Sequence, residues 1–286
     1  MSIRMIATDM DGTLLDGLGQ LDLPRLTTIL DELDKRDIRF VVATGNEIGR
    51  MRNLFGPELA NRITFVVANG ARIFEGEDKI VEQHWDSHLV QDVLEYFASR
   101  ERNYHLVANL QNGPHTLEGM DFPIVDRIMT EERAREFYRQ IHFLSDFQEL
   151  DKEAVIKMSI VVDEEQTSSV TQRINQDFAG RLNAVTSGYG AIDLLPRGIH
   201  KGWGLRSLME RWKIDADQIM AFGDSENDIE MLELAGYSFA MENGEEKVKR
   251  MAKYIAPSND EAGVLPVSYT HLGCGCHLLF LSFKSS

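Results

Sequence analysis

Residues 5–13 read Met-Ile-Ala-Thr-Asp-Met-Asp-Gly-Thr, and this stretch decides the fold that we expect for the chain. Its first part, Met5–Thr8, is a short run of the kind that forms a buried parallel strand. Two carboxylates, Asp9 and Asp11, follow the run at once. In open parallel sheets, ligands bind outside the carboxyl ends of the strands. On its own, Asp-x-Asp-Gly is more often a solvated turn than a functional site. Whether it forms a site here therefore depends on the residues found elsewhere in the chain.

The rest of the chain repeats this strand pattern. Short apolar runs alternate with apolar residues at helical spacing, as in a parallel sheet covered by helices. One helical stretch carries Leu26, Ile29 and Leu30, with Pro24 near its start. We therefore predict an α/β fold with a Rossmann-like parallel-sheet core. Its expected strands are residues 5–8, 39–43, 64–68, 218–222 and 237–241.

The middle third of the chain also mixes helix and strand patterns, but polar groups do not gather at its strand ends. Residues 89–97 present an apolar helix face, and residues 155–162 read as a strand with partial alternation. We interpret this part as an insertion. The expected domains are an inserted α/β cap domain at residues 84–187 and a core made of residues 1–83 and 188–265.

The end of the chain differs from everything before it. It contains Cys274 and Cys276, the only two cysteines, and the apolar run 278–281, with no amphipathic helix leading into them. Our hypothesis is that residues 266–286 are not native to this fold. The alternative is an unusual but real tail, and an intact mass or a genomic sequence for the native C-terminus decides between the two.

Composition restricts the classes of function. The chain is 43% apolar and 27% charged, which is ordinary for a globular protein. Its formal net charge of −16 repels a nucleic-acid backbone, so we expect no nucleic-acid partner. No apolar stretch reaches the roughly 18 residues of a membrane span, and the N-terminus lacks the pattern of a signal peptide. We therefore expect no membrane partner and a cytoplasmic location.

Polar residues gather where other expected strands end. Thr44 follows the second strand, Asn69 the third and Asp224 the strand at 218–222. Lys201 lies just before a predicted helix and could supply a positive charge. Alone, Lys201 reads as a solvated surface group and Thr44 equally as a helix cap or a phosphate contact, whereas the context of Asp224 by itself favours a metal ligand. Because the carboxyl ends of parallel strands share one edge, however, we expect them to converge on the Asp9 region.

The chemistry of this set favours phosphoryl transfer. Asp9, Asp11 and Asp224 would offer the oxygen ligands that Mg²⁺ prefers. One carboxylate can attack phosphorus to form an aspartyl phosphate, and the other can protonate the leaving alcohol and then deprotonate water. A threonine followed by a glycine and a helix start, as at Thr44, can hold a phosphate oxygen.

These runs resemble the haloacid dehalogenase superfamily, in its Cof-type branch of phosphatases with a large inserted cap. The likeness covers about residues 2–264 and is closest to the bacterial sugar phosphatases of that branch. The first of its four motifs, at residues 9–15, is highly specific. The other three are matched by Thr44, by Lys201 and by residues 223–228.

The resemblance implies a role for each matched residue. Asp9 would be the nucleophile and Asp11 the general acid and base. Mg²⁺ would be the cofactor, bound by Asp9, by the backbone carbonyl of Asp11 and by Asp224. Implied phosphate contacts come from the backbone of Met10 and from Thr44, Gly45, Lys201 and Asn227, with Asn46 and Asp228 as supporting residues.

One departure bears on the substrate. Many members of the branch have Thr-Gly-Arg where this chain has Thr44-Gly45-Asn46, and the asparagine resembles the sugar-phosphatase subgroup. We therefore expect Mg-dependent hydrolysis of small phosphate monoesters, with a sugar phosphate as the substrate. The resemblance also implies that the inserted domain closes over the core and excludes water.

Three alternatives stay open. A phosphomutase or phosphotransferase would use the same nucleophile but pass the phosphoryl group to a sugar hydroxyl. A phosphonatase would need an additional amine for a Schiff base with its substrate. A non-catalytic sugar-phosphate sensor would be expected to lose Asp9 or Asp11, and both are present.

Overall fold

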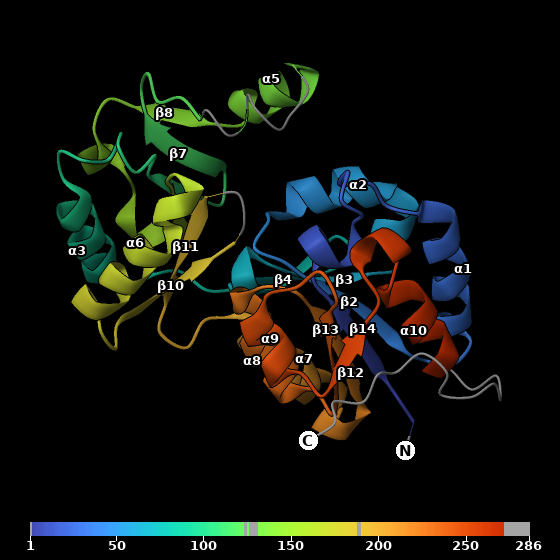
Figure 1. Cartoon of the computed structure of the whole chain (residues 1–286). Helices are drawn as coiled ribbons and strands as arrows, with labels where there is room; N and C mark the ends of the chain where they lie inside the picture. The colour runs from blue at the N-terminus through green and yellow to red at the C-terminus, as the bar shows by residue number, and fades with distance from the viewer. Residues whose placement is uncertain (1, 123–124, 126–130, 188–189, 272–286) are drawn as a thin grey trace. The chain divides into compact units, whose positions relative to one another are not determined.

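The computed structural model describes residues 2–122, 125, 131–187 and 190–271 (Figure 1). The chain divides into two compact units. The first joins Met1–Val81 to the segment that begins at Ile199, and the second is Glu82–Gly198. Each unit has its own sheet and its own hydrophobic core. Among the described helices, none has the length and apolar character needed to cross a membrane.

The first unit is built on an eight-stranded sheet with the order β14-β13-β12-β1-β2-β3-β4-β5. All strands from β14 to β3 run parallel, and β4 pairs with β3 antiparallel. The direction in which strands are added reverses between β1 and β12, so a topological switch point lies there. The strands are β1 (Met5–Thr8), β2 (Arg39–Ala43), β3 (Thr64–Val67), β4 (Arg72–Glu75), β5 (Asp78–Glu82), β12 (Ile219–Gly223), β13 (Tyr237–Met241) and β14 (Tyr254–Ala256).

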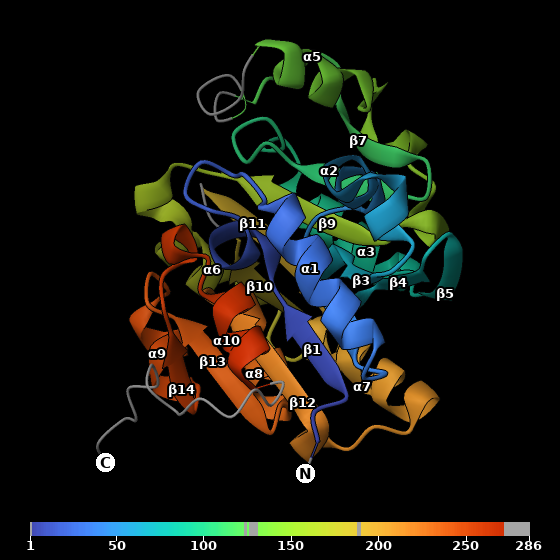
Figure 2. The ribbon, with the colours of Figure 1, turned by 90° about the vertical axis from the view of Figure 1, so that its right-hand side faces the viewer.

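Alternating side chains fill a core on each face of this sheet. Ile6 faces one core, while Met5 and Ala7 face the other, as the period of two of a strand requires. Helices α1 (Leu23–Asp34), α2 (Ile48–Ala60) and α10 (Val264–His271) cover the first face, and α1 and α10 lie in front of the sheet in Figure 2. The second face is covered by α7 (Lys201–Trp212), α8 (Ile229–Leu234) and α9 (Glu246–Met251).

The predicted α/β fold with a parallel-sheet core is confirmed, with small shifts at strand ends. The third strand stops at Val67 because Ala68–Gly70 forms a short turn, η2. The strand expected at 218–222 instead includes Gly223, which pairs with Ala240 of β13. Helix α1 begins where Pro24 predicts, with the side chain of Asp22 accepting the N–H of Arg25 (3.0 Å).

The second unit has a six-stranded sheet with the order β10-β11-β9-β6-β7-β8, mostly antiparallel. Helices α3 (Ser87–Phe97) and α6 (Glu164–Asp177) contribute to its core, and α5 (Glu131–Arg139) lies between β7 and β8 in the chain. The strands are β6 (Val107–Leu110), β7 (Gly113–Leu117), β8 (His142–Leu144), β9 (Lys157–Val161), β10 (Leu182–Thr186) and β11 (Ala191–Pro196).

The predicted boundary of the inserted domain at residue 187 is wrong. Strand β11 belongs to the sheet of the second unit, where it pairs with both β9 and β10, and the unit runs on to Gly198. Ile192 and Leu194 are fully buried in the core of this unit. A central strand of an antiparallel sheet has the same short apolar run as a core strand, which explains the error.

The predicted non-native tail begins inside a packed helix. Leu265 and Val267 of α10 are buried in the core of the first unit, and the Ser268 hydroxyl donates to the carbonyl of Val264 (2.7 Å). The start of the proposed tail at residue 266 thus falls within a structured element. Residues 272–286 lie outside the described part of the chain, and their origin stays a prediction.

Candidate active site

The first strand places Asp9 at the switch point of the sheet. Thr8 is in register with Phe222 of β12, and the backbone N–H of Asp9 donates to the Phe222 carbonyl (3.0 Å). The side chain of Asp9 therefore emerges beside the end of β12, where Asp224 follows. Asp9 is only 4% exposed, which is unusual for a carboxylate without a paired cation.

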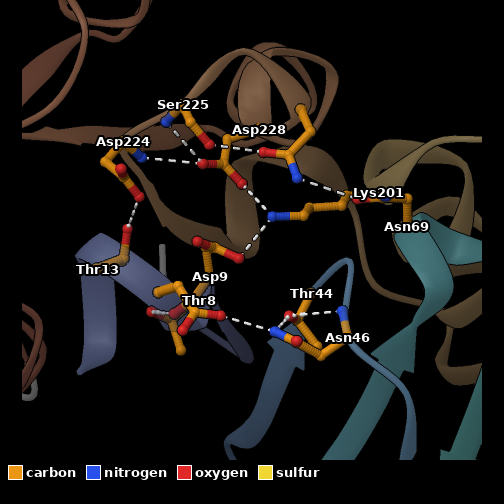
Figure 3. A network of polar contacts seen from close by, with 12 residues as sticks. Thr8, Asp9, Thr13, Thr44, Asn46, Asn69, Lys201, Asp224, Ser225 and Asp228 are labelled. Atoms are coloured by element: carbon orange, nitrogen blue, oxygen red, sulfur yellow. Dashed lines mark hydrogen bonds and ion pairs between the residues drawn. The ribbon is translucent and has the colours of Figure 1, made fainter. Parts of the chain in front are cut away.

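The paired cation is Lys201, at the first position of α7 (Figure 3). Its Nζ donates to Asp9 Oδ1 (2.6 Å) and to Asp228 Oδ1 (2.7 Å), and the residue is completely buried. Helix α7 reaches this depth because its next residue, Gly202, has no side chain. A Cβ there would lie 2.6 Å from the carbonyl oxygen of Glu230 in α8.

Asp228 is fully occupied by hydrogen bonds. Its Oδ2 accepts the backbone N–H groups of Asp224 (2.9 Å) and Ser225 (3.1 Å), while Oδ1 accepts Lys201. The carboxylate thus holds the start of the turn after β12 in place. This capping arrangement explains why the Asp228 carboxylate can be completely buried.

Asp224 is fixed from the opposite side by the turn η1 (Met10–Leu14). The Thr13 hydroxyl donates to Asp224 Oδ1 (2.7 Å), as Figure 3 shows. Gly12 makes this approach possible, because it adopts φ +79° and a Cβ would lie 2.5 Å from Asp224 Oδ2. Within the described residues, Oδ2 of Asp9 and Oδ2 of Asp224 accept no side-chain hydrogen bond.

The cluster has more negative charge than Lys201 can balance. Burial raises the pKa of Asp9 well above its ordinary value, Asp228 and Asp224 raise it further, and Lys201 opposes them. Burial raises the pKa of Asp224 to about 7, with the charge of Asp228 adding to the shift. Burial alone would lower the pKa of Lys201, but Asp228 and Asp9 outweigh it and raise that pKa.

Three carboxylates, those of Asp9, Asp224 and Asp228, each place one oxygen within 4.8 Å of the others. Uncompensated charge and oxygens without donors are what a hard divalent cation requires. The residues present therefore fit a metal ion. The predicted ligands Asp9 and Asp224 belong to this group, whereas the side chain of Asp11 does not.

Asp11 points into a different set of contacts. Its Oδ2 accepts the Asn46 amide (2.7 Å), and Arg50 donates to both carboxylate oxygens, at 2.7 Å to Oδ1 and 3.0 Å to Oδ2. Arg50 was missed in the sequence. It lies in the first turn of α2, and Asn46 precedes that helix, so helical spacing alone does not pair them; the contact between Arg50 and the Asn46 oxygen (2.6 Å) is seen only in the fold.

Thr44 and Asn46 lie in the loop that directly follows β2. The Thr44 hydroxyl oxygen accepts the backbone N–H of Asn46 (3.1 Å) and its side-chain amide (2.9 Å). Thr44 is buried, and Gly45 lies between the two. Met10 is fully buried in the core, so only its backbone is available to the site.

Asn227 contacts Asn69, in the turn η2 that follows β3. Its amide donates to Asn69 Oδ1 (3.1 Å), and its own Oδ1 accepts the Ser225 hydroxyl (2.7 Å). The backbone N–H of Asn69 donates to the carbonyl of Thr44 (3.0 Å). The ends of β2, β3 and β12 are thereby connected around Asp9, as the parallel-sheet pattern predicts.

Two asparagines that the sequence did not single out brace the turn η1. Asn243 donates to the Gly12 carbonyl (2.8 Å), and Asn259 donates to the Leu15 carbonyl (2.8 Å). The two are joined because the Asn259 N–H donates to Asn243 Oδ1 (3.0 Å). Asn243 lies in a turn and Asn259 begins the short helix η7 (Asn259–Glu261), both far from residue 12 in the chain, and no spacing rule relates them to it.

Comparison with known proteins agrees with this geometry. A protein-family model described as haloacid dehalogenase-like hydrolase matches residues 6–267. The chain is 35% identical to the 5-amino-6-(5-phospho-D-ribitylamino)uracil phosphatase YbjI of Escherichia coli K12, over 93% of this chain and 95% of that protein. It is 29% identical to the HMP-PP phosphatase of Citrobacter koseri, over 84% of each chain.

The solved structure of SMU.1108c from Streptococcus mutans UA159 has the same fold. It superposes with a TM-score of 0.83 at 34% identity, covering 95% of this chain and 99% of that one. The match extends over both units of the chain rather than over the core alone. The protein is thus a member of the haloacid dehalogenase-like hydrolases, and within them a Cof-type phosphatase.

Proposed function

We propose that the protein hydrolyses small phosphate monoesters with Mg²⁺ as cofactor and Asp9 as the nucleophile, and that its substrates are sugar phosphates. The observation that carries the proposal is the buried contact between Asp9 and Lys201 beside Asp224. Lys201 holds Oδ1 of Asp9, and no side chain in the described part of the protein donates to Oδ2. This oxygen is therefore directed and available for attack.

The proposed reaction has two steps. Asp9 Oδ2 attacks phosphorus, the bond from phosphorus to the ester oxygen breaks, and Asp11 gives a proton to the departing alcohol. Water then attacks the same phosphorus and gives a proton to Asp11, which releases inorganic phosphate and restores the Asp9 carboxylate. Lys201 stays protonated throughout and offsets the charge on Asp9.

The metal would be held by Asp9 and Asp224, with the backbone carbonyl of Asp11 as the third proposed ligand. The support is chemical, since within the described residues Asp224 Oδ2 accepts no side-chain hydrogen bond and the cluster is short of positive charge. Asp9 would bind through Oδ1, which leaves Oδ2 for the attack. When bound, Mg²⁺ would reduce repulsion between the carboxylates and the phosphate dianion and fix their orientation. Asp228, whose oxygens are occupied, would orient Lys201 and the backbone of Asp224 instead.

The phosphate group would be held by residues around Asp9. We assign this role to Thr44, Lys201 and Asn227, which come from three separate elements. Backbone N–H groups at Met10 and Gly45 would complete the cradle. These groups are fixed by the network between the ends of β2, β3 and β12, so little ordering would be needed when phosphate binds.

The substrate class rests on Asn46 and on a relative. Asn46 contacts both Thr44 and Asp11 and so borders the reacting groups. The relative from Escherichia coli is named for a substrate that carries its phosphate on a ribityl chain. Phosphate release should be measured with Mg²⁺ across sugar, sugar-alcohol, nucleotide and vitamin phosphates. Turnover confined to nucleotides would argue against the sugar-phosphate assignment.

Asp9→Asn tests the mechanism. The variant keeps the shape of the side chain but removes the nucleophilic oxygen, so phosphate release should fall to the background rate. Full activity would refute the covalent mechanism. Release of inorganic phosphate without an acceptor sugar separates a hydrolase from a phosphotransferase, and a failure of borohydride to trap substrate separates it from a phosphonatase. A sensor would bind substrate without releasing phosphate.

A further inference from the structure

Arg50 makes a contact with Asp11 that the proposed reaction does not use. The guanidinium lies along the carboxylate in a two-point arrangement, with one nitrogen opposite each oxygen (2.7 and 3.0 Å). Planar pairs of this kind fix direction as well as distance. The Asp11 side chain is 40% exposed and the Arg50 side chain 47% exposed. Because Asp11 borders solvent, its side chain would change rotamer more easily if the contact with Arg50 were lost.

Asn46 closes the arrangement into a triangle. Its amide nitrogen donates to Asp11 Oδ2 (2.7 Å). Its amide oxygen accepts from Arg50 Nη1 (2.6 Å), the nitrogen that also donates to Asp11 Oδ2. The Asn46 amide also donates to the hydroxyl oxygen of Thr44 (2.9 Å). Arg50 is therefore tied, through Asn46, to the end of β2 and, through Asp11, to the turn that follows β1.

We infer that Arg50 is a positioning residue, which sets the direction of the Asp11 carboxylate and keeps it out of the acidic cluster of Asp9, Asp224 and Asp228. The geometry supports both parts of the inference. Arg50 supplies two of the three hydrogen bonds that described residues donate to the Asp11 carboxylate. Without them, a fourth carboxylate beside the uncompensated cluster of Asp9, Asp224 and Asp228 would be held by Asn46 alone among the described residues. The inference rests on the proposed role of Asp11 as general acid.

A leaving-group comparison isolates this role. Nitrophenolate departs without a proton, whereas the alkoxide of a sugar or glycerol phosphate needs one, so misplacing the general acid harms only the second kind of ester. We therefore compare single-turnover release of the alcohol from p-nitrophenyl phosphate and from glycerol phosphate. A change that merely weakens the fold would lower both rates together.

Arg50→Gln is expected to slow release from glycerol phosphate by at least about tenfold relative to p-nitrophenyl phosphate. Arg52→Gln is the matched control. It lies on the same helix, but its guanidinium pairs with Glu77 (3.2 Å) and with the Gly76 carbonyl (3.2 Å), away from Asp11. The rate ratio of this variant should equal that of the wild type.

Asp11→Asn separates the inference from the proposed function. It should show the same selective loss, and adding Arg50→Gln to it should change the ratio no further. If Asp11→Asn is not selective, the proposed role of Asp11 is wrong and the inference falls with it. If Asp11→Asn is selective but Arg50→Gln lowers both rates equally, the positioning role alone is overturned.

Discussion

Removing the charge of Asp224 should stabilise the metal-free protein while destroying its activity. The carboxylate lies beside Asp228 in a buried cluster, and its pKa is raised from 3.8 to about 7 by burial first and by Asp228 second. A raised carboxyl pKa means that the folded state binds the proton more tightly than the unfolded state does. The resulting destabilisation is absent below about pH 4, grows up to about pH 7 and is complete above it.

The size of the effect follows from the same numbers. One pKa unit corresponds to about 1.4 kcal/mol, so a rise from 3.8 to about 7 sets a ceiling of about 4 kcal/mol. Asp224 is partly exposed, and water screens part of this. We expect Asp224→Asn to gain about 1–3 kcal/mol of unfolding free energy at pH 8. The asparagine oxygen can still accept the Thr13 hydroxyl, so no hydrogen bond is lost there.

Asp228→Asn is the matched control within the same cluster, and it should have the opposite sign. Its oxygens accept Lys201 and two backbone N–H groups, and an amide nitrogen cannot replace an acceptor. Leaving buried donors unpaired should cost about 2–4 kcal/mol. Two Asp→Asn changes a few residues apart would thus move stability in opposite directions.

Urea unfolding in EDTA, followed from pH 5 to pH 8.5, measures both variants against the wild type. The gain of Asp224→Asn should grow with pH and should reverse in saturating Mg²⁺, because a cation that binds only the folded wild type stabilises it. A gain that does not depend on pH, or a loss of stability at pH 8, would show that uncompensated charge does not govern this cluster.

Three further predictions concern the same site. Chelation with EDTA should stop phosphate release and Mg²⁺ should restore it, and turnover that persists in EDTA would exclude the proposed cofactor. Gly12→Ala should lose about 1–3 kcal/mol in urea unfolding, because alanine at φ +79° would also meet Asp224 Oδ2 at 2.5 Å; equal stability would show that the turn adapts. His200 caps α7 by accepting the Trp203 N–H at Nδ1, and burial lowers its pKa, a shift that Glu230 and Glu233 oppose and Arg206 reinforces. The cap formed by neutral His200 should stabilise the folded protein by about 1 kcal/mol, and this contribution should be lost as pH falls below 6.5. The difference in unfolding free energy between wild type and His200→Asn should therefore shrink over that range.

Most of the core and the strand-end residues could be predicted because they obey local rules. A buried parallel strand reads as an apolar run, and the polar residue after it marks the edge where ligands bind, as at Asp9, Thr44 and Asp224. Strand β11 could not be assigned in this way. Its run of apolar residues fits either sheet, and only its pairing with β9 places it in the second unit.

The residues that hold the site in place were harder to predict than those proposed to react. Asn243 and Asn259 act through single hydrogen bonds to backbone carbonyls more than 200 residues away in sequence. Such contacts depend on how loops meet in the folded chain, and no periodicity records them. Arg50 is intermediate, since it lies only four residues after Asn46 but its partner Asp11 is 39 residues away in sequence.

The two aspartates of the first motif illustrate how environment can divide two roles between identical side chains. Asp9 is buried and pairs with a buried lysine through Oδ1, and no described side chain donates to its Oδ2, which suits the proposed attack on phosphorus. Asp11 is 40% exposed and is held by an arginine and an amide that solvent also reaches, which suits a group that must exchange a proton with an alcohol and then with water. Only Met10 lies between them in the chain, but β1 ends between a closed cluster and an open loop. Removing Lys201, the partner of Asp9, should therefore impair the proposed attack on phosphorus. Removing Arg50, the partner of Asp11, should impair the proposed proton transfer instead.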